Sequence, residues 1–551
     1  MRWVITRWQE YLNGLMEIQL FSPAHQRVIL GFILFSCFII RIVTIESAPI
    51  DRTCWKEIDY IMISQNYFHH GFHLLKPEIW WTAEPPRTTA MEFPIVPFAA
   101  GLLYAMFGFS TLTARLISLL SYIVFSLYLF KLVKREIGPF IGILAALAAS
   151  IIPLYHFFGN ILFSEPPMIA LSVIALYHFA QWMDFKRRWD WIISMLAFSL
   201  AVAIKLEPLY LLLPLFWIAF RKNKFDIKKY GGFLLLAGCA LALPIIWFSY
   251  AYYLTFHSID VFGIFKGHNK LQSFTMLSNI AWYKTMFSRI GGDILGGKFG
   301  SMLFVLGVIS MSVIKKTNLF FIYLFTIGCY FCLVAEGNID APYRQLHGLA
   351  SFSIFIAAGS LFIVFILFTV VPASWRQLKP LFQSTPVALT MCVCLLMIGP
   401  LRKTNIIFNS NPFSHTDMLR WNLSRIIKNH AKPGTKIISA GEYTIHKGGN
   451  DLSPLIYYYS GFQGWTIQRP QWNIDTVDKL IDKGATIFAA TQMSREPDAA
   501  PFLKQMRLRY SVMLDDSINE LLLLDLKAQN KFEKQITKPQ QAAGTSSDKK
   551  T

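Results

Sequence analysis

The sequence predicts a polytopic α-helical membrane protein with about eleven transmembrane helices and a small α/β domain at its C-terminal end. Of the 551 residues, 54% are hydrophobic and only 15% are charged, whereas a soluble chain carries roughly 25% charged residues. Apolar runs long enough to cross a bilayer recur between residues 27 and 400. The net charge of +19 is gathered in short basic clusters between these runs.

Residues 1–26 are predicted to form a cytoplasmic interfacial segment rather than a cleavable signal peptide. Trp3, Trp8 and Leu12 alternate with charged residues such as Arg7, so a helix here has one apolar and one charged face. Such a helix lies in the plane of the membrane surface, before the first span.

Eleven segments have the length and apolar character expected of transmembrane helices. They are 28–46, 111–130, 139–158, 166–183, 190–204, 208–220, 231–253, 297–314, 318–335, 349–371 and 383–400. A few are short and require buried ends or slight thinning of the bilayer. Residues 94–108 are also apolar, but counting them as a span would place a later basic cluster outside. We therefore expect a juxtamembrane helix that dips into the outer interface.

Basic residues occupy every second loop, and this pattern predicts the orientation of the chain. Clusters that include Lys134, Arg187, Lys222, Lys315 and Arg376 follow the second, fourth, sixth, eighth and tenth segments. Loops rich in lysine and arginine stay in the cytoplasm, so these loops and the N-terminus are predicted to be cytoplasmic and the C-terminal portion extracytoplasmic. The pattern indicates a bacterial inner (plasma) membrane protein in contact with membrane lipids, and it argues against nucleic acid as a partner.

The C-terminal part of the chain changes character. In residues 401–529 the apolar density drops, and short strand-like runs alternate with helix-like segments, which predicts a small extracytoplasmic α/β domain. The strand-like runs are 436–440, 485–490 and 520–526, and the helix-like segments are 475–483 and 501–509. Residues 530–551 are polar and biased in composition, and they are predicted to form a disordered tail.

The predicted extracytoplasmic loop 47–110 concentrates carboxylates and tryptophans. It contains Glu57, Asp59 and Glu92 together with Trp55 and Trp81. Aromatic faces stack on sugar rings, and a carboxylate can take a proton from an attacking hydroxyl group. We therefore consider Trp55, Trp81 and Glu92 as residues that bind the acceptor or the sugar. The alternative is interfacial anchoring by the tryptophans among ordinary solvated charges.

Two later outside loops place single charged residues near the membrane surface. Glu165 precedes two prolines at the start of a span, where a negative charge is favoured; it is either a functional acid or only a helix cap. Lys205 lies between two apolar segments, where it can bind a lipid phosphate or simply reach toward the interface. Arg344, in the outside segment 335–348, is a second candidate for holding phosphate.

Short motifs stand in order along the predicted outer face. They are Trp55-Lys-Glu-Ile-Asp59, Glu92-Phe-Pro94 leading to Ala114-Arg115, Phe163-Ser-Glu165-Pro166, Ala201-Val-Ala-Ile-Lys205 and, more loosely, Pro342-Tyr343-Arg344. In this order they resemble bacterial membrane glycosyltransferases of the GT-C superfamily. The most similar group contains the protein O-mannosyltransferases and the lipid A aminoarabinose transferase. The resemblance covers residues 45–220 well, and the remaining spans by topology.

This resemblance implies an inverting transfer of a hexose or pentose from a polyprenyl-phosphate-linked donor to an acceptor hydroxyl on the extracytoplasmic face. It implies that Asp59 is the general base, with Glu57 as its rival, and that Glu165 belongs to a second acidic motif. The residues expected to bind the donor phosphate are Lys205, Arg344, Arg87 and Arg115. The acceptor is a glycan, a lipid or a protein, and the sequence leaves both it and the sugar open.

The sequence establishes no cofactor beyond the lipid-linked donor substrate. The sequence shows no Gly-rich phosphate loop, which agrees with a donor that is not a nucleotide sugar. The resemblance leaves a divalent metal possible, but no cluster of ligands in this sequence supports one. One rival function is a transporter or flippase for a lipid-linked saccharide, which would favour inverted repeats and broken helices. Another is a non-catalytic membrane scaffold that displays the C-terminal domain.

Overall fold

The computed structural model describes residues 6–12, 22–45, 54–258, 260–265, 273–314, 317–369, 385–402, 415–441, 453–493 and 498–529. The predicted tail 530–551 and much of the predicted N-terminal segment lie outside the described residues. The chain forms two compact units. The first comprises residues 1–49, 63–77 and 89–412, and the second comprises residues 50–62, 78–88 and 413–551.

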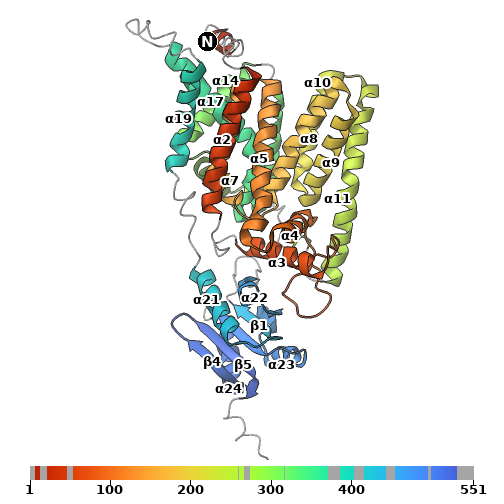
Figure 1. Ribbon diagram of the computed structural model, residues 1–551, viewed down its shortest axis with the longest axis vertical. Coiled ribbons are helices and arrows are strands. Elements are labelled where there is room, and N and C mark those ends of the chain that lie inside the picture. Colours follow the sequence, from red (N-terminus) through yellow and green to blue (C-terminus); the bar gives the residue numbers. More distant parts are fainter. Residues whose placement is uncertain are drawn as a thin grey trace, which may run out of the picture. The chain divides into compact units, whose positions relative to one another are not determined.

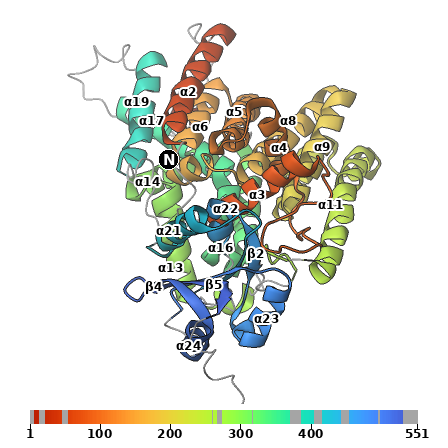
Figure 2. The same ribbon diagram turned by 60° about the horizontal axis from the view of Figure 1, so that its bottom comes forward.

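The first unit is built from helices, several of which run side by side along its long direction (Figures 1 and 2). They are α2 (Pro23–Thr44), α3 (Cys54–His70, whose first turns belong to the second unit), α4 (Ile95–Phe107), α5 (Thr111–Glu136), α6 (Pro139–Ile151), α7 (Pro153–Phe158), α8 (Glu165–Phe185), α9 (Arg188–Ile204), η2 (Glu207–Leu211), α10 (Leu212–Asn223), η3 (Ile227–Tyr230), α11 (Gly231–His257), α12 (Ser273–Leu277), α13 (Ile280–Arg289), the π-helical turn η4 (Ile290–Ile294), α14 (Lys298–Ser312), α15 (Asn318–Leu333), α16 (Ala335–Asp340), η6 (Pro342–Gly348), α17 (Leu349–Thr369) and α19 (Thr385–Arg402).

Among the described residues, five helical segments are long and apolar enough to cross a membrane. They are Pro23–Val43, Thr111–Glu136, Glu165–Phe185, Ile227–His257 and Pro342–Thr369. A bent pair, Ile280–Ile294 and Lys298–Ser312, meets at 96° and adds a sixth if it counts as one span. The chain is therefore a helical, multi-pass membrane protein. Each of the eleven predicted segments contains helix, residues 94–108 coincide with α4, and the number of spans stays a prediction.

One predicted span, 139–158, is interrupted. Its first helix, α6, ends at Ile151, the next residue, Ile152, has an extended backbone, and a new short helix, α7, begins at Pro153. Proline disfavours the helical conformation of the residue before it, so Pro153 explains the break. The buried guanidinium of Arg41 donates to the carbonyl of His156 at 3.2 Å and to Oδ1 of Asn160 at 3.0 Å. These bonds hold the loop that leads to α8.

The N-terminal helical turn over residues 6–12 packs on protein. Trp8 is 1% exposed, and its indole N–H donates to the carbonyl of Ser310 in α14 at 3.1 Å. Its ring also lies 5.1 Å from Phe362 and 5.2 Å from Phe365 of α17. The sequence placed Trp8 on the apolar face of an interfacial helix. In the structure, that face covers the ends of α14 and α17.

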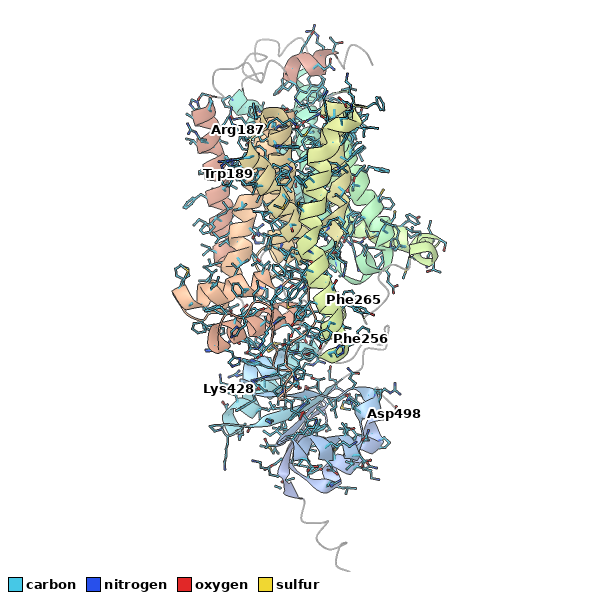
Figure 3. All side chains as sticks on the ribbon, turned by 90° about the vertical axis from the view of Figure 1, so that its right-hand side faces the viewer. Arg187, Trp189, Phe256, Phe265, Lys428 and Asp498 are labelled. Carbon is cyan, nitrogen blue, oxygen red and sulfur yellow. The ribbon has the colours of Figure 1, made fainter. Side chains whose placement is uncertain are left out.

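Helices α5, α8 and α10 end at the same side of the first unit. Arg135 forms ion pairs with Glu136 and with Asp184, and the nitrogens of Arg221 and Lys222 lie 2.6 Å from Glu136 and 2.5 Å from Asp184. The opposite end of α8 is Glu165. Helix α8 has 21 residues, so its two ends are about 30 Å apart, the thickness of a bilayer core. Figure 3 shows the same separation, with Arg187 and Trp189 at one end of the helices and Phe256 and Phe265 at the other.

The second unit contains a five-stranded sheet between two layers of helices. Its elements are α21 (His415–His430), β1 (Lys436–Gly441), α22 (Leu455–Ser460), β2 (Gln463–Thr466), η8 (Arg469–Gln471), α23 (Ile474–Asp482), β3 (Ile487–Thr491), α24 (Ala499–Arg509), β4 (Tyr510–Asp516) and β5 (Leu521–Gln529). The strand order is β2-β1-β3-β5-β4. Strand β1 is parallel to β2 and β3, while β5 is antiparallel to β3 and β4.

Alternating side chains of the strands supply two cores. Ile438 and Leu524 face a core shared with α23 and α24, while Ile437 and Leu523 face one shared with α21 and α22. This is the period-two pattern of strands buried on both faces. The predicted runs at 436–440, 485–490 and 520–526 coincide with β1, β3 and β5, and the predicted helices coincide with α23 and α24.

Candidate active site

A buried ion pair joins Glu165, the first residue of α8, to Lys205, which follows α9. The Lys205 Nζ lies 2.6 Å from Oε1 of Glu165, with the side chains 4% and 0% exposed. Ser164 donates to the other oxygen of Glu165 at 3.0 Å. A charge removed from water is tolerated when it is paired and hydrogen-bonded. Helix α9 ends at Ile204, and the extended backbone of Lys205 directs the chain away from the helix axis.

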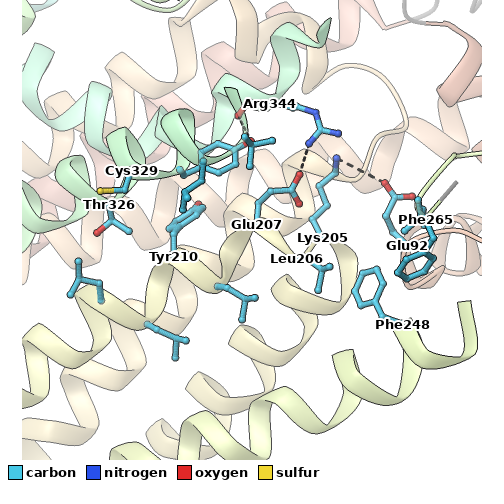
Figure 4. A pocket seen from close by; sticks show the side chains of 17 residues that line it. Glu92, Lys205, Leu206, Glu207, Tyr210, Phe248, Phe265, Thr326, Cys329 and Arg344 are labelled. Atoms are coloured by element: carbon cyan, nitrogen blue, oxygen red, sulfur yellow. Dashed lines mark hydrogen bonds and ion pairs between the residues drawn. The ribbon is translucent and has the colours of Figure 1, made fainter. Parts of the chain in front are cut away.

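Glu92 is brought to the same lysine by the segment that precedes α4. The Phe93 N–H donates to the carbonyl of Ala203 at 3.0 Å, and the Trp247 indole donates to the carbonyl of Met91 at 3.0 Å. These contacts attach the segment to α9 and α11. As a result, Oε1 of Glu92 lies 3.9 Å from the Lys205 Nζ (Figure 4).

A second cation, Arg344 of η6, lies beside the loop between α9 and α10. Its Nη1 lies 2.6 Å from Oε1 of Glu207. Burial alone would raise the pKa of Glu207, but the charges of Lys205 and Arg344 hold that pKa below its ordinary value, so this carboxylate is ionised. Both cations also lie near the ring of Tyr343, at 5.2 Å and 5.9 Å from its centroid.

Some of these charged groups line the polar end of a cavity of about 910 Å³ in the first unit (Figure 4). Lys205, Glu207, Arg344 and Glu92 contribute to its wall. The rest of the wall is largely apolar and includes Leu206, Leu209, Leu212, Leu213, Phe248 and Leu333. Pockets of this size, mostly apolar with a few convergent polar groups, are typical ligand sites. The cavity suits a molecule with an anionic head and a hydrocarbon tail.

Two first-loop carboxylates, Asp59 and Glu57, belong to the second unit. Asp59, in α3, is 4% exposed and accepts a hydrogen bond on Oδ1 from the Trp81 indole at 3.0 Å. Burial raises the pKa of Asp59 well above its usual range, while the Trp81 hydrogen bond and the nearby Lys56 oppose that shift. Glu57, the rival base, is fully buried. An aspartate with a raised pKa has the property expected of a general base.

The other predicted site residues have separate environments. In the second unit, Trp55 donates to Oδ1 of Asp417 at 3.1 Å, and Arg87 donates to Oε1 of Gln463 at 3.1 Å. In the first unit, Arg115 is 1% exposed and donates to the carbonyl of Ile45 at 2.5 Å. Among the first-unit candidates, the structure therefore brings together Glu92, Glu165, Lys205 and Arg344, and it leaves Arg115 elsewhere.

Sequence reasoning did not select two features of this site. Glu207 stands two residues after Lys205, and its position near membrane depth is a signal that could have identified it. The two tyrosines beside the cations were not selected either: Tyr330 lies in an apolar run without any signal, whereas Tyr343 stands in the motif Pro342-Tyr343-Arg344 but was given no role. Within the described residues, no group of three or more His, Cys, Asp or Glu side chains could hold a metal ion.

A family match over part of the chain and a shared fold relate this chain to known proteins. The family described as dolichyl-phosphate-mannose-protein mannosyltransferase matches residues 87–249. This range contains Glu92, Arg115, Glu165 and Lys205, but neither Asp59 nor Arg344. No curated protein matches the sequence significantly. The resemblance to GT-C glycosyltransferases expected from the motifs is thus confirmed by an independent match over part of the chain.

Several solved structures share the fold of this chain. ArnT from Cupriavidus metallidurans in the apo state is 12% identical, with a TM-score of 0.63 over 90% of this chain and 97% of that chain. The same protein bound to undecaprenyl phosphate is 13% identical, with a TM-score of 0.62 over 90% and 98%. The apo oligosaccharyltransferase of Archaeoglobus fulgidus is 10% identical, with a TM-score of 0.54 over 90% and 74%. The chain has the fold of these membrane glycosyltransferases.

Proposed function

We propose that this protein transfers a sugar from a polyprenyl-phosphate-linked donor to an acceptor hydroxyl group on the extracytoplasmic face of the membrane. The observation that carries this proposal is the cavity with Lys205 and Arg344 at one end and leucine side chains along its wall. Its polar end suits a phosphate and its apolar wall suits a prenyl chain. ArnT, which shares the fold, is known in a form bound to undecaprenyl phosphate, and this supports a lipid of that kind.

In the proposed reaction, the acceptor oxygen attacks the anomeric carbon while the bond from that carbon to the phosphate oxygen breaks. The configuration at the anomeric carbon inverts. Asp59 takes the acceptor proton, with Glu57 as the rival base. The departing polyprenyl phosphate gains one negative charge, which Lys205 and Arg344 stabilise. Glu165, Glu92 and Glu207 hold these two cations in the cavity before the phosphate arrives.

We also propose the orientation of the protein: an inner-membrane protein with eleven spans, a cytoplasmic N-terminus and an extracytoplasmic α/β domain. The basic ends of α5, α8 and α10 lie about one bilayer thickness from Glu165. Because basic ends stay in the cytoplasm, the cavity belongs to the opposite face. This face has lipid-linked rather than nucleotide sugars, in agreement with the proposed donor.

The direct test is a comparison of envelope glycans and lipids by mass spectrometry in cells with the wild-type chain, without it, and with Asp59→Asn. We expect one glycosylated species that requires the wild-type chain and is lost in the variant. If that species persists with Asp59→Asn, Asp59 is not the base. If no species depends on the chain, while undecaprenyl-linked saccharides move across vesicle membranes only in its presence, the protein is a flippase.

Donor binding is tested with undecaprenyl phosphate, the lipid part of the donor. Lys205→Ala removes a charged donor to the phosphate, so we expect the affinity to fall about 10- to 100-fold. Lys222→Ala is the matched control, because it also breaks a lysine–carboxylate ion pair but lies at the opposite end of the helices. Equal affinity of wild type and Lys205→Ala would contradict the assignment of this cavity.

A further inference from the structure

Residues 78–88 of the first loop join the edge of the C-terminal sheet. Strand β2 lies at the edge of the sheet, and its Gly464 N–H donates to the carbonyl of Trp80 at 3.2 Å. Gln463, next to it, accepts from Arg87 at 3.1 Å. The segment folds back on itself, because the Ile79 N–H donates to the carbonyl of Arg87 at 3.1 Å. It therefore contacts the edge strand β2 through one main-chain and one side-chain hydrogen bond.

The next residue of this segment, Trp81, contacts both the sheet unit and Asp59. Its indole N–H donates to Oδ1 of Asp59, and its ring centroid lies 6.5 Å from that of Tyr457 in α22. The Tyr457 hydroxyl is itself bound to Ser439 of β1 at 2.7 Å and to Thr466 of β2 at 2.9 Å. A continuous set of contacts thus runs from two strands through Tyr457 and Trp81 to Asp59.

A second connection holds the start of α3 in the same unit. Trp55, four residues before Asp59, donates to Asp417 of α21 at 3.1 Å. Asp417 also accepts from Arg420 at 3.2 Å, and the Arg420 guanidinium lies 5.4 Å from the Trp55 ring centroid. All three side chains belong to the second unit. The helical turn that carries Asp59 is therefore fixed at Trp55 as well as at Asp59.

We propose that the C-terminal α/β unit orients the Asp59 carboxylate through Trp81, so that Trp81 is a positioning residue for the proton transfer. This inference rests on the proposed function, because it requires Asp59 to be the base. An indole N–H can only donate, so it binds Oδ1 as an acceptor and determines which oxygen is held. Among the described residues, no donor is bound to Oδ2 of Asp59. Oδ2 is the oxygen left to receive the acceptor proton.

The test is an infrared titration of the purified full-length protein in lipid nanodiscs. The band of the protonated Asp59 carboxyl is identified by its loss in Asp59→Asn. Trp81→Phe keeps an aromatic ring beside Tyr457 but removes the N–H that stabilises the ionised carboxylate. We expect Asp59 to stay protonated to a pH about one to two units higher in this variant. Transfer below that pH should fall about 10- to 100-fold, with unchanged affinity for undecaprenyl phosphate.

Two further variants separate this role from a general effect on folding. Trp472→Phe is the matched control: it removes an indole hydrogen bond, to the carbonyl of Ile467 at 3.3 Å, in the same unit but away from Asp59. In this variant, Asp59 should titrate as it does in the wild type. Tyr457→Phe removes only the hydroxyl that ties Tyr457 to β1 and β2, and a smaller shift in the same direction is expected. This variant decides the question if Trp81→Phe does not fold.

The proposal is overturned if Asp59 titrates in Trp81→Phe as it does in the wild type, or if Trp472→Phe shifts the titration equally. With an unfolded Trp81→Phe, a wild-type titration in Tyr457→Phe also overturns it. Failure of the proposed function is recognised separately. In that case Asp59→Asn retains transfer activity, whatever the infrared titration of Trp81→Phe shows about the orientation of the carboxyl group.

Discussion

At the scale of single residues, the site depends on charges that are buried in pairs. Lys205 and Glu165 are both almost inaccessible to water, and their nitrogen and oxygen lie 2.6 Å apart. Such a pair adds little net stability, because desolvation of the two ions offsets most of their attraction. Removing one partner is different, since the remaining ion is then buried without its counter-charge. Each member of the pair therefore allows the other to stay charged within a largely apolar wall.

Lys205 and Glu165 are therefore predicted to be strongly coupled in their effect on stability. Lys205→Met is expected to destabilise the protein by about 3–5 kcal/mol, because Glu165 loses its counter-ion. The double variant Lys205→Met/Glu165→Gln should lower the free energy of unfolding by clearly less than the sum of the two single changes. Thermal unfolding in detergent measures this cycle. Lys222 and Asp184, which are partly exposed, provide the control cycle, with an expected coupling below about 1 kcal/mol. If the changes in the free energy of unfolding at Lys205 and Glu165 are additive, the two residues do not form a buried ion pair.

Asp59 gives a prediction for pH dependence. Its pKa is raised by burial, and the base must be ionised to accept a proton. Transfer activity should therefore fall on the acidic side, with a midpoint above the ordinary aspartate value of about 3.9. At the optimum, Asp59→Asn should lower the rate by about 10²- to 10⁴-fold. An acid limb at or below the ordinary value would show that Asp59 is not the titrating base.

The contribution of Asp59 to stability changes with pH in the opposite direction to transfer activity. Because the folded-state pKa of Asp59 is raised, this residue favours the folded state at low pH, and the contribution is lost as the pH rises through that pKa. Asp59→Asn has no charge to bury and can still accept the bond from Trp81. Its unfolding temperature should therefore exceed that of the wild type above this pH. A difference independent of pH would argue against a buried, titrating carboxyl group.

At the scale of helices and strands, sequence patterns located most elements but not their contacts. Apolar runs placed the helices because each must satisfy its own backbone within the membrane. The break at Pro153 could have been predicted from the proline rule, whereas β2 and β4 could not. Strand β2 has only four residues, and much of β4 is exposed, so neither shows a continuous apolar run. Nor does the pattern indicate which helices meet, because that depends on small residues in both partners.

Helices α14 and α17 cross at small residues contributed by both helices. A Cβ atom on Gly307 would lie 1.8 Å from the carbonyl oxygen of Phe355, and one on Gly359 would lie 1.8 Å from that of Leu303. The two helices touch through their backbones, as small residues allow in membranes. Gly307→Ala should therefore force the helices apart and destabilise the protein by about 1–3 kcal/mol.

Gly328 of α15 is the matched control for this substitution. It also lies inside an apolar helix, but nothing is within 4 Å of the position of its Cβ. Gly328→Ala is expected to be neutral or to stabilise by about 0.5–1 kcal/mol, from helix propensity. Thermal unfolding of both variants in the same detergent measures the difference. Equal unfolding temperatures for the two alanine variants would exclude the close backbone contact.

At the scale of the whole molecule, the sequence identified the loops that supply the site, but not which of their side chains pair with each other. The orientation rule placed Glu165, Lys205 and Arg344 on one predicted face, and the structure brings all three to one region of the helical unit. Pairing is not visible in a sequence, because Lys205 and Glu165 are 40 positions apart and meet only through the packing of α8 on α9. For the same reason, the sequence could not show that residues 78–88 fold with strands near residue 464.

Fused reporters measure the proposed orientation of the protein in the membrane. A reporter placed after residue 529 is expected to read as extracytoplasmic. One inserted after Arg187, between α8 and α9, should read as cytoplasmic because this loop carries a basic cluster. The two insertion sites control each other, since an inverted protein would reverse both signals. If both reporters read the same side, the number of spans between Arg187 and the C-terminal unit is even, not odd. If that side is the cytoplasm, the unit that holds Asp59 is cytoplasmic, and the proposed transfer on the extracytoplasmic face is excluded.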